Sequence, residues 1–135
     1  MSENVTTILL VENEEHLQRS IRQMLERAGY VVLPASHGIE ALRIIEEDDG
    51  RIDVVLTDIA LPQMRGPELA DRMKGRRPNI AVLYMSGFGV DGLRPDEASR
   101  LSGQFLQKPF RKDTLLQKLE QTLTLQVQSR AKNAS

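Results

Sequence analysis

The chain has 135 residues, of which 40% are hydrophobic and 27% are charged, which is typical of one soluble globular domain with a single core. Its 18 basic and 19 acidic residues leave a formal net charge of −1, so the sequence offers no electrostatic footprint for nucleic acid. The absence of cysteine excludes disulfides, thiolate metal sites and a cysteine nucleophile.

The apolar run at residues 8–11 is too short for a signal peptide or a membrane span. We therefore expect a cytoplasmic domain with no membrane insertion.

Short apolar runs predict five β-strands, and helical patterns lie between most of them. The predicted strands are residues 8–11, 30–33, 52–57, 80–85 and 105–107. The first helix has Asn13 as its expected N-cap and Gly29 as its stop, the third begins at Pro67, and the last follows Pro109 over residues 111–124. Gly92 and Pro95 interrupt residues 90–101, for which we expect a short or mobile helix.

This alternation predicts an α/β fold with right-handed crossovers. Five strands favour the flavodoxin-like (βα)5 three-layer sandwich, with a five-stranded parallel sheet in the order 2-1-3-4-5 and a ligand crevice at the carboxyl ends of strands 1 and 3. We expect an N-terminal extension at residues 1–5, the domain at 6–125, and a polar tail at 126–135 that is frayed or disordered.

Polar side chains follow the ends of four predicted strands, at one rim of the predicted sheet. In VVLTDIALP, residues 54–62, Asp58 directly follows a buried-looking run, where a charge is costly to desolvate. The other residues at this rim are Glu12, Asn13 and Glu14 after strand 1, Ser86 after strand 4 and Lys108 after strand 5. Such a set suits a phosphoryl site, with Mg²⁺ on hard oxygen ligands and Asp58 as the nucleophile.

Four short motifs carry a family resemblance: VENEE, LTDIALPQMRG, YMSG and QKPF. In this order and context they resemble the response-regulator receiver domain of two-component signalling, a chemotaxis-regulator-like family, over about residues 6–125. The sequences of the segments LTDIALPQMRGPELA and VLYMSGF are most similar to those of receivers at the C-terminus of hybrid histidine kinases.

The resemblance implies a role for each matching residue. Asp58 is implied as the phosphoacceptor, Ser86 as the switch hydroxyl and Lys108 as the phosphoryl contact. Phe105 is implied as the switch aromatic. The implied metal ligands are Glu12, Asn13, Asp58 and the main-chain carbonyl of Ala60.

The implied activity is that of a signalling module, not of an enzyme, although such a module assists its own phosphorylation and dephosphorylation. The phosphoryl group would come from a phosphohistidine on a histidine kinase or a histidine phosphotransfer protein. A downstream protein, which the sequence does not name, would read the face built from residues 90–101, strand 5 and helix 111–124. No nucleic-acid partner is expected.

Asn13 departs from the family pattern, which has a second acid at this position. A unit charge at about 4 Å, at an effective dielectric near 20, is worth ~4 kcal/mol before desolvation is subtracted. We expect a net loss of about 1–2 kcal/mol, or roughly tenfold in metal affinity, so Mg²⁺ binding should be weak. Glu14 fits the start of the first helix better than a metal site. A degenerate receiver that acts as a phosphorylation-independent interaction module is therefore the alternative.

Simpler roles exist for each residue taken alone. Asp58 could cap a turn, Lys108 and Ser86 could be loop residues, and Phe105 could simply pack on its strand. A remote alternative is a dinucleotide-binding domain, because GFGVDG at 87–92 satisfies G-x-G-x-x-G after a strand. The sequence around this motif does not fit a dinucleotide-binding domain, because Pro95 interrupts the helix that should follow the motif.

Overall fold

The computed structural model describes residues 5–48, 50–87, 94–100 and 104–134, in which strands and helices alternate. The strands are β1 (Thr7–Val11), β2 (Val31–Ala35), β3 (Ile52–Asp58), β4 (Ala81–Ser86) and β5 (Gln104–Gln107). The helices are α1 (Glu15–Arg27), α2 (Gly38–Glu47), α3 (Gly66–Arg76), α4 (Pro95–Arg100) and α5 (Lys112–Ala134).

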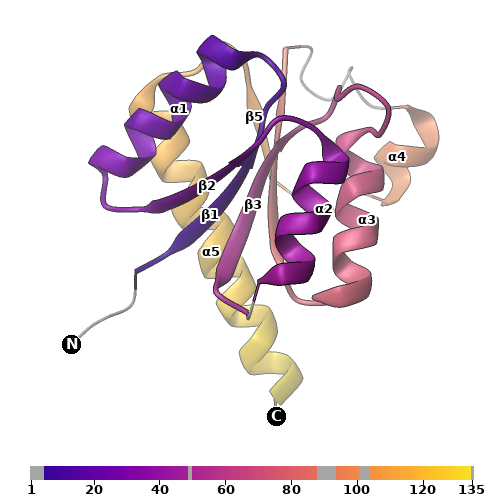
Figure 1. The fold of residues 1–135 in the computed structure, drawn as a ribbon. Helices are drawn as coiled ribbons and strands as arrows, with labels where there is room; N and C mark the ends of the chain where they lie inside the picture. The colour runs from indigo at the N-terminus through magenta and orange to yellow at the C-terminus, as the bar shows by residue number, and fades with distance from the viewer. Residues whose placement is uncertain (1–4, 49, 88–93, 101–103, 135) are drawn as a thin grey trace.

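The strands form one parallel sheet in the order β2-β1-β3-β4-β5. Helices α1 and α5 cover one face, and α2 and α3 cover the other, with α4 beside α3 (Figure 1). This arrangement confirms the predicted flavodoxin-like sandwich and its strand order. It differs from the strand order of a Rossmann dinucleotide domain, 3-2-1-4-5-6. Residues 88–92 of the GFGVDG motif lie outside the described residues.

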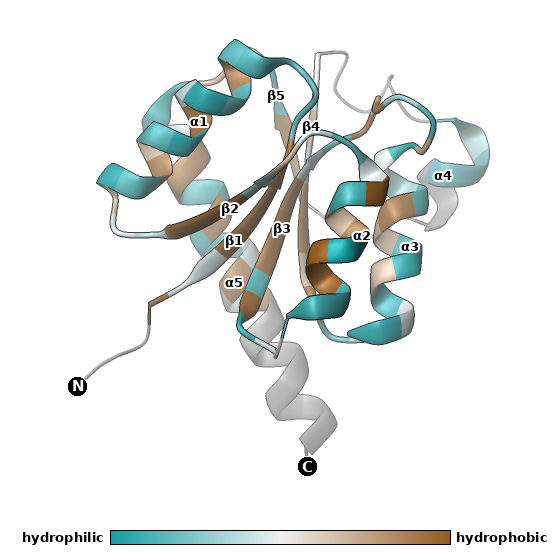
Figure 2. Cartoon of the chain, viewed as in Figure 1, coloured by the Kyte–Doolittle hydropathy of each residue, from teal (hydrophilic) through white to brown (hydrophobic). Residues whose placement is uncertain are grey.

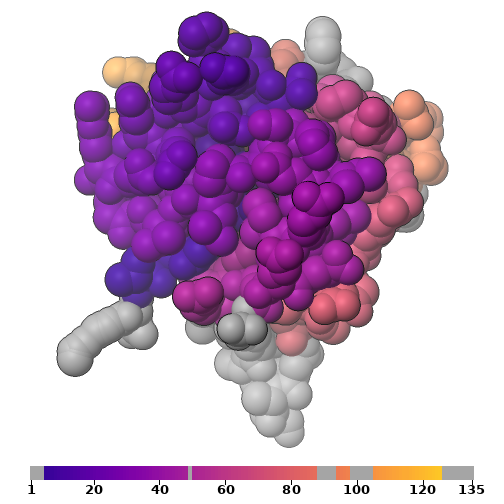
Figure 3. Space-filling view, viewed as in Figure 1, coloured from indigo at the N-terminus to yellow at the C-terminus, as the bar shows by residue number. Residues whose placement is uncertain are grey.

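The core has two halves because successive side chains of a strand point to opposite faces. In β1, Ile8 and Leu10 pack with Ile21 and Leu25 of α1, whereas Leu9 and Val11 pack on the α2 and α3 side. The strands are mostly apolar, and polar residues lie on the outer faces of the helices (Figure 2). In the space-filling view, side chains close the space that separates α1 from α2 in the ribbon (Figure 3).

The predicted strand limits shift by one or two residues. The largest difference is in β2, which continues through Pro34 to Ala35 instead of ending at residue 33. Proline lacks an N–H group and is tolerated in an edge strand. Strand β2 is such an edge and pairs only with β1.

The ends of α1 are partly as expected. Gly29 has a φ of 98° and follows the helix, and Tyr30 N–H donates to the carbonyl of Leu25 at 3.1 Å, so Gly29 is the predicted stop. The expected N-cap is wrong, because Glu14 occupies that position instead of Asn13. The Glu14 carboxylate accepts hydrogen bonds from the N–H groups of His16 and Leu17.

Two further helices bear on the predictions. Helix α4 is short, as expected, at Pro95–Arg100. The frayed or disordered tail at residues 126–135 stays a prediction, and the described backbone of α5 runs past the sheet to Ala134 (Figure 1). This segment has no proline or glycine to end the helix, and its Gln, Arg, Ala and Lys residues favour helical backbone. Within the described ranges, no helix is long and apolar enough to cross a membrane.

Gly66 fixes the start of α3 against the end of β3. A Cβ atom built on Gly66 would lie 2.1 Å from the carbonyl oxygen of Asp58. Gly66 N–H also donates to the carbonyl of Ile59 at 2.8 Å. Because the close neighbours are backbone atoms, a side chain at this position could fit only if the chain around Asp58 moved.

We predict that Gly66→Ala lowers the free energy of unfolding by about 1–3 kcal/mol, the usual cost of overpacking. Gly75→Ala is the matched control in the same helix, because a Cβ atom there meets nothing within 4 Å. The free energy of unfolding of the control should rise by about 0.5–1 kcal/mol, because alanine stabilises a helix more than glycine does. Urea denaturation measures both variants, and equal shifts of the same sign would contradict the proposed constraint.

Candidate functional site

The register of the sheet brings the predicted polar residues to one rim. Val11 pairs with Thr57, Asp58 with Met85, and Ser86 with Gln107. The carboxyl ends of β1, β3, β4 and β5 therefore meet around a cavity of about 420 Å³. The residues that line it include Glu12, Asn13, Glu14, Asp58, Ala60, Arg65, Ser86 and Lys108.

Lys108 joins the two buried carboxylates of the cavity. Its Nζ lies 2.8 Å from Oε1 of Glu12 and 2.5 Å from Oδ1 of Asp58. The Lys108 side chain is 22% exposed, against 3% for Glu12 and 9% for Asp58. The backbone holds the lysine in place, because Lys108 N–H donates to the carbonyl of Ser86 at 2.9 Å.

Burial and mutual contact shift the protonation of these groups. Burial, followed by a hydrogen bond with Glu12, raises the pKa of Asp58 to about 8, although Lys108 opposes the shift. Burial also tends to raise the pKa of Glu12, but hydrogen bonds with Asp58, Lys108 and the Glu14 N–H leave it below its usual value. Burial lowers the pKa of Lys108, but hydrogen bonds to both carboxylates raise it overall. The opposite shifts of the two carboxyl groups favour a proton on Asp58 over one on Glu12.

The loop after β1 brings both Glu12 and Glu14 to the cavity wall, but the Glu14 carboxylate is engaged with the start of α1. Glu12 Oε2 accepts a hydrogen bond from Glu14 N–H at 2.8 Å, and Gln18 Nε2 donates to the Glu12 carbonyl at 3.0 Å. The carboxylate of Glu14 caps α1. Asn13 is exposed, and its Nδ2 donates a long hydrogen bond of 3.4 Å to the carbonyl of Ser36. Glu14 is therefore poorly placed to replace the charge that Asn13 lacks.

The remaining predicted residues lie at different distances from this centre. Asn13, Ala60 and the buried Ser86 line the cavity wall. Phe105 is not among the lining residues found in the described part of the chain; it stacks on Tyr84, with ring centroids 5.6 Å apart. The structure thus brings Glu12, Asp58 and Lys108 into contact, whereas Phe105 contacts Tyr84.

Sequence reasoning missed the cavity residue Arg65. Its Nε and Nη2 atoms donate to the two carboxylate oxygens of Glu97 in α4, at 2.7 and 2.8 Å. One signal was available: Arg65 precedes Gly66 and Pro67 at the N-cap position of α3, where Ser, Thr, Asp or Asn is usual. Nothing in the sequence pattern pointed to Glu97 as its partner.

The oxygen atoms at this rim fit a hard divalent cation. Two neighbouring carboxylates can bind a cation in place of a proton, and a carbonyl and an amide oxygen are also available at Ala60 and Asn13. Across the described residues, no group of three or more His, Cys, Asp or Glu side chains could hold a metal ion. Carboxylate, carbonyl and amide oxygens are the kind of ligand that Mg²⁺ takes, and Mg²⁺ usually keeps several waters beside one or two carboxylates.

We predict that Asp58 makes the fold less stable as the pH rises. Its pKa of about 8 in the folded state exceeds the ordinary value of 3.8, so the unfolded chain releases this proton first. The contribution of Asp58 to the free energy of unfolding therefore falls between about pH 4 and pH 8. The free energy of unfolding of the Asp58→Asn variant should therefore exceed that of the parent by about 1–3 kcal/mol at pH 8, and by little at pH 5.

Urea denaturation at the two pH values without divalent cations measures this difference. Asp71→Asn, an exposed change on α3, is the control and should show the same difference from the parent at both values. A pH-independent difference for Asp58→Asn would show that Asp58 is already ionised at pH 5.

The comparisons with known proteins agree with this geometry. The family model of the response regulator receiver domain matches residues 8–120. The sensor kinase CckA of Brucella abortus is 36% identical over 104 residues, which cover 77% of this chain and 11% of that protein. The response regulator receiver protein CpdR of Brucella abortus is 33% identical over 116 residues, which cover 86% of this chain and 95% of that protein.

Solved structures show the same relationship. The receiver domain of the hybrid histidine kinase CckA superposes with a TM-score of 0.74 at 32% sequence identity, covering 87% of this chain and 98% of that one. The family match, the strand order and the polar residues around Asp58 lead to one conclusion. The chain belongs to the response regulator receiver domain family of two-component signalling.

Proposed function

We propose that this receiver domain accepts a phosphoryl group on Asp58. The observation that carries the proposal is the contact of Lys108 Nζ with both Asp58 and Glu12 in the cavity. It places a partly exposed ammonium group beside a buried carboxylate. An ammonium group in this position can meet the oxygens on which charge develops during phosphoryl transfer.

The reaction would be a displacement at phosphorus. A carboxylate oxygen of Asp58 attacks the phosphorus atom of a phosphohistidine, a P–O bond forms, and the P–N bond breaks. The electron pair of that bond returns to the imidazole nitrogen, and the product on Asp58 is an acyl phosphate. The attacking form is the ionised carboxylate, which the raised pKa of Asp58 disfavours, and the proton that Asp58 releases passes to solvent. Lys108 then stabilises the charge on the transferred group.

Mg²⁺ would be held by Glu12, Asp58, the main-chain carbonyl of Ala60 and, weakly, Asn13. When bound, it would neutralise the carboxylates and part of the phosphoryl charge. We expect weak binding because Asn13 brings no charge and Glu14 caps α1. The same groups would assist dephosphorylation, when water attacks the acyl phosphate.

Ser86 and Phe105 would transmit the change. Ser86 lines the cavity at the end of β4. In the neighbouring strand β5, Phe105 directly precedes Leu106, and Leu106 pairs with Met85, the residue before Ser86. If the Ser86 hydroxyl moves to donate to a phosphoryl oxygen, Phe105 can change its packing on Tyr84. The face of α4, β5 and α5 would then differ between two states, and a downstream protein that prefers one would detect the phosphate.

The phosphoryl donor would be a histidine kinase or a histidine phosphotransfer protein in the cytoplasm. The similarity to the CckA receiver supports this kind of donor. An alternative remains because of Asn13: a degenerate receiver that binds its partner without phosphorylation.

We predict that acetyl phosphate with Mg²⁺ adds one phosphoryl group to the chain and none to the Asp58→Asn variant. Asp58 is the carboxylate that contacts Lys108 at the cavity. Asp53→Asn is the matched control, because Asp53 lies in the same strand and accepts a hydrogen bond from Thr7 N–H instead. Intact mass spectrometry measures the product. A parent that stays unlabelled would favour the degenerate receiver.

We predict that Asn13→Asp tightens Mg²⁺ binding by about tenfold, equivalent to ~1.4 kcal/mol, because it adds a charged ligand. Glu14→Gln should change the affinity little, since the Glu14 carboxylate is engaged with the N–H groups of His16 and Leu17. A metal titration of the three proteins measures both effects. Loss of affinity in Glu14→Gln with no gain in Asn13→Asp would assign the metal contact to Glu14.

A further inference from the structure

Arg65 and Glu97 connect the cavity wall to α4. The guanidinium group of Arg65 donates two hydrogen bonds to the carboxylate of Glu97, and the two side chains are 22% and 5% exposed. Arg65 itself lines the cavity that contains Asp58. A bidentate, largely buried pair of this kind holds its two segments together more firmly than a surface ion pair.

Glu97 also holds the first turn of α4. Its Oε1 accepts a hydrogen bond from Arg94 N–H at 2.8 Å, and Glu97 N–H donates back to the Arg94 carbonyl at 2.9 Å. This is the reach of a third-position glutamate back to the N-cap residue of a helix. The same carboxylate thus orders the start of α4 and binds the cavity arginine.

The position of Arg65 supports a role in the cavity over a role in capping α3. It occupies the N-cap position of α3, but its side chain makes no capping hydrogen bond. An arginine at a position that favours small polar residues breaks a local preference, and such breaks are expected at functional sites.

A phosphoryl group would change the charge balance around Arg65. It adds about −1.5 to −2 charges and acceptor oxygens. Lys108 is already shared between Glu12 and Asp58. Arginine binds phosphate oxygens in the same bidentate manner as it binds a carboxylate, so the two anions compete for one guanidinium group.

We propose that Arg65 is a second cation of the phosphoryl site, held by Glu97 in the unphosphorylated protein, and that a phosphoryl group on Asp58 draws it away and loosens the start of α4. This inference rests on the proposed phosphoacceptor function. It identifies Arg65 as a residue that binds the phosphoryl group directly, and Glu97 as the anion that competes with that group for Arg65. It also gives α4 a link to the phosphate that does not pass through Ser86 or Phe105.

Two neutralising substitutions separate this role from a merely structural one. Glu97→Gln and Arg65→Gln both break the pair, so each should raise hydrogen exchange in residues 94–100 of the unphosphorylated protein by about tenfold. Their rates of labelling by acetyl phosphate should differ. Glu97→Gln leaves the cation and should label at least as fast as the parent, whereas Arg65→Gln should label about threefold to tenfold more slowly.

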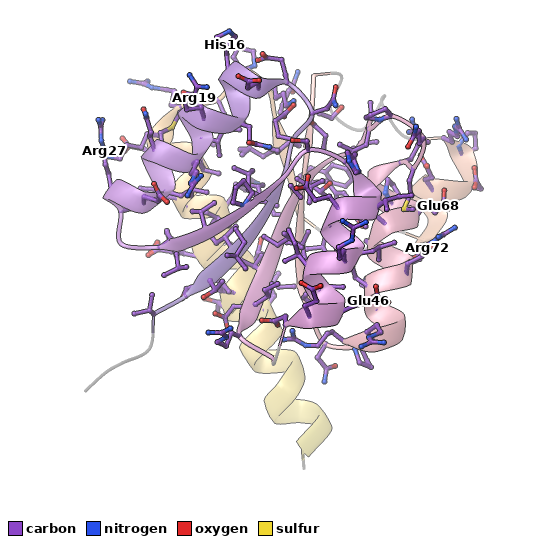
Figure 4. The ribbon with its side chains drawn as sticks, in the orientation of Figure 1. His16, Arg19, Arg27, Glu46, Glu68 and Arg72 are labelled. Carbon is purple, nitrogen blue, oxygen red and sulfur yellow. The ribbon has the colours of Figure 1, made fainter. Side chains whose placement is uncertain are left out.

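Two further variants complete the design. Arg65→Lys keeps the positive charge but lacks the planar guanidinium group that makes two parallel hydrogen bonds. It should recover most of the labelling rate that Arg65→Gln loses, but not the protection of α4 from hydrogen exchange. Glu68→Gln is the control, because it breaks the exposed Arg72–Glu68 pair on α3, 2.9 Å long (Figure 4). Neither residue is among those found to line the cavity in the described part of the chain. It should behave as the parent in both measurements.

Intact mass and hydrogen exchange are measured on the same samples, before and after acetyl phosphate with Mg²⁺. We expect hydrogen exchange in residues 94–100 of the parent to rise with phosphoryl occupancy. In Arg65→Gln, where exchange is already raised before phosphorylation, it should not rise further when the variant is labelled. A labelled parent with unchanged exchange there would overturn the inference alone. So would equal labelling rates for Arg65→Gln and Glu97→Gln. A parent that gains no phosphoryl mass would overturn the proposed function, and the inference would fall with it.

Discussion

The contact of Lys108 with Glu12 and Asp58 is the interaction on which the site depends. Two carboxylates from neighbouring strands approach closely in a buried place, and such an arrangement is tolerable only with positive charge and a proton, which the pKa shifts favour on Asp58. The lysine comes from the far side of β4, after β5. The strand order and the register are therefore requirements of the site as well as properties of the fold.

The surroundings of Asp58 divide into a fixed side and an adjustable side. Gly66 approaches the Asp58 carbonyl so closely that the start of α3 must follow the end of β3. Gln18 similarly fixes the loop after β1, because its amide donates to the carbonyls of both Glu12 and Ala35. On the other side, α4 is short, and the side-chain pair of Arg65 and Glu97 connects it to the cavity wall. Charge added at Asp58 would therefore act on polar side-chain contacts before it acts on the sheet.

Local patterns predicted the parts of the molecule that local physics determines. Apolar runs gave the five strands to within two residues, and the residue after each strand gave the rim that contains Glu12, Asp58, Ser86 and Lys108. The N-cap of α1 was misassigned because Glu14 can reach two N–H groups from the next position. The pair of Arg65 and Glu97 was missed because it joins residues 32 apart, and no periodicity reports such a contact.

The anchored backbone at Gly66 has a consequence for how this domain could be altered. Because Gly66 ties its segment of chain to β3, the backbone at position 65 is fixed at the cavity wall. The side chain at position 65 can therefore be exchanged while the backbone around it keeps its position. A change at position 65 or 97 would thus alter the contact between the cavity wall and α4 while leaving the sheet and the contacts of Lys108 with Glu12 and Asp58 in place.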